Sequence, residues 1–334
     1  TNIQNQYAAS KKAVITTTIF KDETKVTSVT QNITIGANAN QTIKQNAEVE
    51  SPILWSVEKP ELYTAVTEIS VDDKIVDQYK TNFGIRDFKF DVNKGFILNG
   101  KQVKIKGVCM HHDLGALGSA INTRAIERQL EILKEIGVNG IRTSHNPPAP
   151  ELLELCDKMG FIVMDEAFDM WKQNKTKYDY ANDWDKWHRQ DLSDQLRRDR
   201  NHPSIFMWSI GNEIPEQWND EGIKIAKELA EIVRLNDKTR PITAGKNPPV
   251  NMNIDEVTLQ FEKKNVSINP LAGSGVLDLI GYNYAHQTYE HHQKNFPNKP
   301  FIATETTSGL QTRGYYDTNS EEIKKWPVRW DLKF

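Results

Sequence analysis

Short apolar runs alternate with amphipathic segments from Val103 onward, and this alternation constrains the fold more than any other feature of the chain. The amphipathic segments predict helices, the first of which Thr123 is expected to cap and Gly137 to end. Strands that alternate with helices are typical of a parallel sheet covered by helices. We count seven candidate buried strands, at residues 104–108, 138–142, 161–164, 205–208, 241–244, 277–281 and 301–304.

Seven strands of this kind predict an α/β TIM barrel, a (β/α)₈ fold, that lacks its eighth strand. After Glu305 the sequence contains Gly314-Tyr315-Tyr316 and Trp326-Pro327-Val328, but no further apolar run of the kind that forms a buried strand. We therefore expect the barrel to be incomplete at its C-terminal end, or to be completed by another chain.

The first part of the chain follows a different pattern. Short segments rich in β-branched residues are separated by turns such as Asp72-Asp73-Lys74, which predicts a β-sandwich. This region has no histidine and no cluster of catalytic residue types, so its expected role is structural. We place the sandwich at residues 1–88 and the incomplete barrel at residues 89–334. The predicted sandwich strands are 13–20, 25–35, 62–69 and 75–79.

Polar side chains follow most of the candidate barrel strands, at the end where each strand leads into the next helix. The carboxyl ends of parallel barrel strands meet on one face, so these side chains are expected to converge on one pocket. The groups are His111, Arg142 with His145, Asp165 with Glu166, Asn212 with Glu213, Asn283 with Tyr284, and Glu305.

Glu213 and Glu305 each end an apolar run, and a pair of carboxylates is what hydrolysis of a glycosidic bond requires. One carboxylic acid protonates the leaving oxygen, and the other meets the positive charge that develops at the anomeric carbon. A separation of about 5–5.5 Å would allow direct attack with retention of configuration. One such glutamate alone would more often be a strand-end charge facing water, but the pair favours catalysis.

Two other groups leave alternatives open. His111, His112 and His145 could bind a transition metal, but their spacing is not that of a metal site, and hydrogen bonding to sugar hydroxyls is the preferred interpretation. Asp165 and Glu166 could be the catalytic pair instead, although structural support of the barrel mouth is slightly preferred.

Composition excludes several classes of protein. The net charge of −3 argues against nucleic acid or an anionic membrane as the main partner. No apolar run approaches the roughly 20 residues of a transmembrane helix, so we expect a soluble protein. Its compartment stays unknown, with the bacterial cytoplasm and periplasm as the two candidates. Cys109 and Cys156 lie far apart without metal or redox spacing, which predicts small buried thiols and leaves the compartment open.

Five stretches carry a family resemblance: Gly95-Phe96-Ile97-Leu98-Asn99-Gly100-Lys101, Arg142-Thr143-Ser144-His145-Asn146-Pro147, Asp165-Glu166-Ala167, Trp208-Ser209-Ile210-Gly211-Asn212-Glu213 and Ala303-Thr304-Glu305. They resemble glycoside hydrolase family 2, the family of β-galactosidases, β-glucuronidases and β-mannosidases. The resemblance runs from about residue 52 to the end of the chain. It implies a jelly-roll domain, an immunoglobulin-like sandwich and a catalytic barrel. The jelly roll, the first sandwich strand and the eighth barrel strand are expected to be missing here.

The resemblance also implies roles for individual residues. Glu213 would be the general acid/base, and Asn212 would hold the sugar 2-hydroxyl. Glu305 would be the nucleophile, although the following Thr306 stands where many members have a tyrosine, and Tyr284 would contact it. The other implied sugar contacts, on the pocket floor and on the first strand, are Arg142, His145 and His111.

No cofactor is implied as a requirement. Some β-galactosidases of the family bind magnesium through a Glu-x-His motif just after the third strand, but that place reads Phe168-Asp169-Met170-Trp171-Lys172 here, so the motif is not matched. The family's glucuronidases recognise the sugar carboxylate through an Asn-x-Lys motif, which would lie beyond Phe334.

Together these observations predict a retaining exo-β-glycosidase that hydrolyses terminal β-D-galactosides in a double displacement. β-Glucuronidase and β-mannosidase are the alternatives within the family. An alternative from another class is a catalytically inactive fragment that binds sugar or packs in an assembly. The expected partner is a β-linked oligosaccharide or glycoside, a homo-oligomer is possible, and no nucleic acid or membrane partner is expected.

Overall fold

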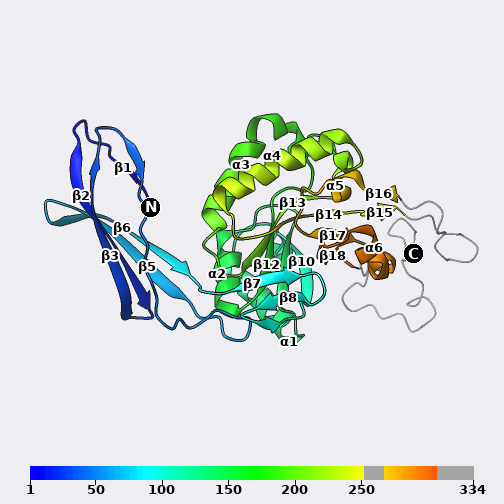
Figure 1. Cartoon of the computed structure of the whole chain (residues 1–334), viewed down its shortest axis with the longest axis horizontal. Coiled ribbons are helices and arrows are strands. Elements are labelled where there is room, and N and C mark those ends of the chain that lie inside the picture. Colours follow the sequence, from blue (N-terminus) through cyan, green and yellow to red (C-terminus); the bar gives the residue numbers. More distant parts are fainter. Residues whose placement is uncertain (252–266, 307–334) are drawn as a thin grey trace, which may run out of the picture.

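The computed structural model describes residues 1–251 and 267–306 of the 334-residue chain. A β-rich N-terminal domain lies at one end of the molecule, and a sheet wrapped by helices forms the part next to it (Figure 1). Within the described residues, the helices are all too short or too polar to cross a bilayer.

The N-terminal domain contains two antiparallel sheets. The larger sheet has the order β3 (Thr24–Ile35), β2 (Lys11–Lys21), β5 (Tyr63–Val71), β6 (Lys74–Phe83), and the smaller pairs β1 (Asn2–Gln4) with β4 (Asn40–Thr42). This sandwich-like arrangement confirms the predicted fold of the region. The shared core is aliphatic and consists of Ile3, Ala13, Ile15, Ile33, Ile35 and Ile43.

A small three-stranded sheet closes one end of the barrel. It consists of β7 (Phe88–Asp91), β8 (Gly95–Leu98) and β9 (Lys101–Gln102). Phe96 and Leu98 on β8 are buried in a cluster with Phe206 from inside the barrel. Trp55 lies in the chain segment that connects β4 to β5, and its fully buried side chain joins the same cluster. Its indole N–H donates to the backbone carbonyl of Asp157 at 2.9 Å. The small sheet and the Trp55 segment therefore anchor the N-terminal domain to the barrel.

The barrel sheet has seven parallel strands, which confirms the predicted α/β architecture. Every adjacent pair in the sheet is parallel, so all seven carboxyl ends lie on one face. In spatial order the strands are β10 (Gly107–His111), β11 (Gly140–Ser144), β12 (Ile162–Glu166), β13 (Ile205–Asn212), β14 (Ile242–Lys246), β17 (Ile280–Asn283) and β18 (Phe301–Glu305).

The first barrel strand was predicted at the wrong place. It begins at Gly107, three residues after the predicted start, and His111 is its last residue. Val103 and Ile105, whose alternation suggested a strand, pack instead against the cluster around Phe96. These two apolar side chains therefore help to fill the end of the barrel next to the small sheet and are not part of a barrel strand.

Six α-helices are present in the described residues: α1 (Thr123–Glu135), α2 (Pro150–Met159), α3 (Trp184–Asp199), α4 (Asp220–Asn236), α5 (Pro270–Gly273) and α6 (His292–Asn295). The cap of α1 is Asn122, whose side chain accepts from the N–H of Ala125, so the prediction of Thr123 as cap was wrong by one residue. Shorter elements are η1 (Gly115–Leu117), η2 (Tyr180–Asn182), η3 (Pro215–Trp218), η4 (His286–His291), β15 (Val250–Asn251) and β16 (Ser267–Ile268).

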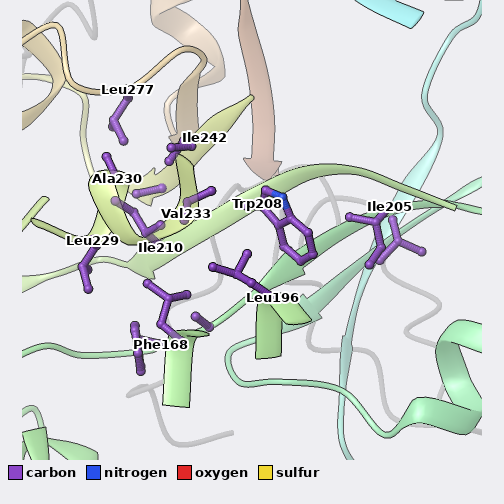
Figure 2. Packing of buried hydrophobic residues seen from close by; sticks show 14 of the residues in the cluster. Phe168, Leu196, Ile205, Trp208, Ile210, Leu229, Ala230, Val233, Ile242 and Leu277 are labelled. Carbon is purple, nitrogen blue, oxygen red and sulfur yellow. The ribbon is translucent and has the colours of Figure 1, made fainter. Parts of the chain in front are cut away.

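The main core lies between the outer face of the sheet and helices α3 and α4. Figure 2 shows Trp208 and Ile210 of β13 among the side chains of this core, with Leu196 of α3 and Val233 of α4. These four side chains are at most 2% exposed. Because alternate residues of β13 are committed to this core, the residues between them face the barrel interior.

The sheet has two unpaired edges in the described residues, because β10 and β18 stand at opposite ends of the strand order. A cavity of about 1330 Å³ runs along these edges, from Phe90 and Phe96 of the small sheet to Glu305 at the strand ends. The predicted lack of a strand after Glu305 concerns residues 307–334, which lie outside the described part of the chain.

Candidate active site

Arg142 is the centre of the hydrogen-bond network at the carboxyl ends of the strands. It lies on β11, is only 4% exposed, and uses three nitrogen atoms. Nη1 donates to Oε1 of Glu305 at 2.6 Å, Nη2 donates to Oδ1 of Asn212 at 2.8 Å, and Nε donates to Oε2 of Glu166 at 3.0 Å. One guanidinium thus joins three neighbouring parts of the strand-end face.

Glu305, at the end of β18, is held as an acceptor by three donors. Besides Arg142, the amide of Asn283 donates to its Oε1 atom at 3.0 Å, and the hydroxyl of Tyr284 donates to the carboxylate. Burial by itself would raise the pKa of Glu305, but the hydrogen bonds from Tyr284 and Arg142 outweigh it and hold the pKa below its usual value. Glu305 is therefore ionised at neutral pH.

Glu213 follows directly after β13 and has a left-handed backbone conformation with φ of 44°. Such a conformation costs a non-glycine residue on the order of 1–3 kcal/mol and persists where the surroundings hold it. Here the Glu213 N–H donates to the carbonyl of Gly245 at 2.8 Å. The turn directs the Glu213 side chain toward Asn283, whose amide nitrogen lies 2.9 Å from its Oε1 atom.

The single amide nitrogen of Asn283 bonds both glutamates. Its distances to Oε1 of Glu213 and Oε1 of Glu305 are 2.9 and 3.0 Å, so these oxygens can be at most about 6 Å apart (2.9 plus 3.0). Retaining glycosidases place their carboxyl groups about 5–5.5 Å apart, whereas inverting enzymes need about 6.5–9.5 Å to admit a water. The Thr304 hydroxyl, which donates to the Asn283 carbonyl, fixes which end of the amide faces the glutamates.

Glu166 is fully buried at the end of β12 and organises the network from behind. Its Oε2 atom accepts from Arg142 and, at 2.6 Å, from Ser209, and its Oε1 atom lies 2.7 Å from Nδ1 of His145. Nε2 of His145 is in turn 3.7 Å from Glu305. The structure thus places Glu166 in the predicted pocket, where support of the barrel mouth stays the preferred prediction for its role.

Gly245 on β14 is a further residue that sequence reasoning missed. A Cβ atom at this position would lie 2.8 Å from Nη2 of Arg142 and 3.0 Å from the side-chain oxygens of Asn212 and Asn283. The network around Arg142 therefore fills the space that any other residue would need. No local signal in the sequence distinguishes this glycine from one in a turn.

The structure brings most of the predicted site residues together. His111 is the outlier, because it is exposed and approaches the network through its ring, edge-to-face with that of His145 at 5.2 Å. The residues joined by hydrogen bonds are Arg142, His145, Asn212, Glu213, Tyr284 and Glu305, and their individual roles stay predictions.

The residues present do not fit the magnesium site of some family members. Asp169 is the one carboxylate in residues 168–172, and its Oδ1 atom already accepts from Lys175 Nζ at 2.8 Å and from Asn212 Nδ2 at 3.0 Å. In the described ranges no three His, Cys, Asp or Glu residues are grouped so that they could hold a metal ion.

Two family models match the chain. The model described as "Glycosyl hydrolases family 2, TIM barrel domain" matches residues 90–328, and the one described as "Glycosyl hydrolases family 2" matches residues 1–86. Among curated proteins, the chain is 50% identical over 321 residues to "Beta-galactosidase BoGH2A" of Bacteroides ovatus, which covers 87% of this chain and 36% of that protein.

A "Beta-glucuronidase" of Bacteroides fragilis is 32% identical over 226 residues, covering 64% of this chain and 32% of that protein. Among solved structures, a glycosyl hydrolase family 2 member from Bacteroides cellulosilyticus superposes with a TM-score of 0.81 at 39% identity, covering 90% of this chain and 36% of that one. The chain thus spans about a third of the length of these relatives.

Proposed function

Since this chain belongs to glycosyl hydrolase family 2, we propose that it forms the catalytic barrel of a retaining exo-β-glycosidase. The observation that carries the proposal is the Asn283 amide nitrogen, which lies within hydrogen-bond distance of Glu213 and Glu305 at once. One oxygen of each carboxyl group is therefore less than about 6 Å from the other, which supports the close spacing of a retaining enzyme over the wider spacing of an inverting one. With it we propose the division into an immunoglobulin-like domain at residues 1–88 and a barrel at residues 89–334.

In the first step Glu305 attacks the anomeric carbon while Glu213 gives its proton to the glycosidic oxygen. The C–O bond to the aglycone breaks, the aglycone leaves as an alcohol, and a glycosyl ester forms on Glu305. The lowered pKa of Glu305 supports this role, because the nucleophile must be ionised. Arg142 and Tyr284 hold the carboxylate by hydrogen bonds, which restricts the direction of its attack.

In the second step Glu213, now a carboxylate, takes a proton from water, and the water oxygen attacks the anomeric carbon. The ester bond to Glu305 breaks, the sugar leaves with its original configuration, and Glu213 is again protonated. Asn212 is assigned to the sugar 2-hydroxyl, since its amide is fixed by Arg142 on one side and Asp169 on the other. Hydrogen bonds to this hydroxyl strengthen in the transition state.

A terminal β-D-galactoside is the proposed substrate. The 50% identity to a protein named a β-galactosidase supports this choice, and the relative named a β-glucuronidase keeps the glucuronide as second candidate. β-Mannoside is retained as a third possibility within the family.

Turnover of nitrophenyl β-galactoside, β-glucuronide and β-mannoside tests the proposal. Turnover is measured with this chain alone and with a protein in which this chain is extended to the full length of its relatives. That longer protein is called the complete enzyme below. The β-galactoside is expected to give the highest kcat/KM, with the β-anomer of the sugar as first product by NMR. A higher kcat/KM for another sugar changes the substrate, and an α-anomer as first product excludes the retaining mechanism. Activity of the complete enzyme alone would show that catalysis needs residues outside this chain, whereas no turnover by either would favour the inactive alternative.

A further inference from the structure

Lys175 lies beside the site, in the loop that follows β12, and makes two hydrogen bonds of 2.8 Å. One goes to Oδ1 of Asp169 and the other to the backbone carbonyl of Asn212. Asp169 uses the same oxygen to accept from the amide of Asn212 at 3.0 Å. The lysine and the aspartate thus hold Asn212 at two points, its main chain and its side chain.

The amide of Asn212 is oriented by its neighbours on both ends. Its oxygen accepts from Arg142 at 2.8 Å, so the nitrogen must face Asp169. An amide nitrogen carries two hydrogens. Asp169 takes one of them, and the second has no acceptor among the residues that the structure describes. That hydrogen is available to a ligand hydroxyl.

The peptide group between Asn212 and Glu213 is held from both sides as well. Lys175 binds its carbonyl, and Gly245 accepts from its N–H at 2.8 Å. Glu213 has the left-handed backbone conformation directly after this peptide. Contacts that fix the peptide plane therefore limit where the Glu213 carboxyl can point.

The loop that carries Lys175 is itself built to hold it. The backbone N–H groups of Lys175 and Thr176 both donate to Oδ2 of Asp179 at 2.7 Å, and Asn174 donates to its other oxygen at 2.8 Å. At the start of the loop the fully buried Trp171 donates to the carbonyl of Ile210 on β13 at 2.8 Å. The backbone of Lys175 is thus held in place by the loop, and the ammonium group by its bonds to Asp169 and Asn212.

We propose that Lys175 and Asp169 are positioning residues that set the Asn212 amide, and through the adjoining peptide Glu213, for the transition state of a glycoside with a free 2-hydroxyl. This inference rests on the proposed function. The positive charge of Lys175 compensates the partly buried carboxylate of Asp169. Asp169 in turn accepts from the Asn212 amide and so fixes the orientation of the group that faces the sugar.

The test compares a nitrophenyl glycoside with its 2-deoxy analogue, using the complete enzyme. Asn212→Ala sets the reference, because it removes the contact that only the 2-hydroxyl substrate can make. Lys175→Met and Asp169→Asn are expected to lower kcat for the 2-hydroxyl substrate by on the order of 10²-fold, as for a small misplacement of a catalytic contact. The fold-loss on the 2-deoxy substrate should be several-fold smaller, and KM should change less than kcat.

Lys172→Met is the matched control, since Lys172 lies in the same loop but is 55% exposed and pairs with Glu221 at 3.9 Å. It should leave the ratio between the two substrates unchanged. Lys175→Arg keeps the positive charge. The ratio of kcat for the 2-hydroxyl substrate to kcat for the 2-deoxy substrate should therefore be closer to the wild-type value in this variant than in Lys175→Met. The arginine variant also keeps the test possible if the methionine variant folds poorly. Equal fold-losses on both substrates in Lys175→Met and Asp169→Asn, or an effect of Lys172→Met as large as theirs, overturn the inference. A wild-type enzyme without glycosidase activity overturns the proposed function itself, and this inference with it.

Discussion

The Nη1 atom of Arg142 lies 2.6 Å from Oε1 of Glu305, and the same guanidinium holds Glu166 through Nε and Nη2 at 3.0 and 2.8 Å. Burial alone would lower the pKa of Arg142, but the charges of Glu166 and Glu305 raise it, so the guanidinium stays charged. Glu166 therefore helps to neutralise the Arg142 guanidinium, which also faces Glu305. The desolvation cost of a buried charge is offset only when oppositely charged partners lie within hydrogen-bond distance.

Replacing Glu166 with glutamine should weaken both stability and catalysis. The variant leaves Arg142 with one carboxylate fewer in a buried site, and breaking such a pair costs about 3–5 kcal/mol. The unfolding midpoint and kcat measure the two effects in the complete enzyme. Ser209→Ala is the control, because it removes one hydrogen bond to Glu166 without a change of charge, and its effects should be smaller. A glutamine variant as stable as the wild type would contradict the role of the pair.

Glu305 should be labelled by a 2-deoxy-2-fluoro glycoside with a reactive leaving group. Fluorine destabilises the transition states of both steps, while the leaving group lets the first step proceed, so the ester accumulates. Peptide mapping of the complete enzyme is expected to find the label on the peptide that contains Ala303-Thr304-Glu305. A label on Glu166 or Glu213 would move the nucleophile to that residue.

Glu213→Ala should keep more activity toward activated aryl glycosides than toward natural ones. A good leaving group needs no proton, whereas general acid catalysis is worth about 10²–10⁴-fold for a poor one. Azide should restore turnover by attacking the glycosyl ester and give a β-glycosyl azide, which mass spectrometry and NMR can identify. Equal losses on both kinds of substrate, without azide rescue, would remove Glu213 from the role of acid/base.

Tyr284→Phe should move the acidic limb of the pH–activity profile upward. In the wild type, burial tends to raise the pKa of Glu305, and the hydrogen bond from Tyr284 is the foremost of the contacts that lower it. Without the hydroxyl, Glu305 binds a proton at higher pH and is lost as a nucleophile sooner when the pH falls. The profile of kcat/KM between pH 3 and 7 checks this, and an unchanged acidic limb would contradict it.

Asp165→Asn should stabilise the protein at neutral and alkaline pH. Burial, and next the charge of Asp199, raise the pKa of Asp165 well above its usual value. The folded state therefore binds a proton that the unfolded state releases, so wild-type stability falls as the pH rises toward the folded pKa. Asparagine can still accept from Gln195 and donate to Asp199 without that penalty.

The unfolding midpoint of this variant, measured from pH 4 to 8, is expected to exceed that of the wild type by an amount that grows with pH. Each kcal/mol corresponds to about 2–4 °C for a domain of this size. Asp194→Asn is the control, because Asp194 is 58% exposed on α3, the helix that carries the Asp165 neighbours Gln195 and Asp199. A difference that does not depend on pH would mean that Asp165 is not protonated in the folded state.

The barrel and its two glutamates could be predicted because their signals are local. An apolar run that ends in Asn212-Glu213 predicts, within a few residues, a buried strand with a carboxylate at its end. A parallel sheet then brings the carboxyl ends of such strands to one face. Strand boundaries were less certain. Val103 and Ile105 have the alternation of a barrel strand but pack against Phe96, and only the tertiary structure shows which partner an apolar side chain takes.

What the sequence by itself determined is thus the fold class, the strand order along the chain and the pair of glutamates. The tertiary structure alone decided that one amide of Asn283 spans Glu213 and Glu305, that Gly245 leaves room for Arg142, and that Lys175 reaches the main chain of Asn212. These contacts join residues that lie far apart in the chain and depend on side-chain direction within a fraction of an ångström. A local pattern carries no information about such distances, because they arise only when the strands β11, β13, β14, β17 and β18 are assembled into one sheet.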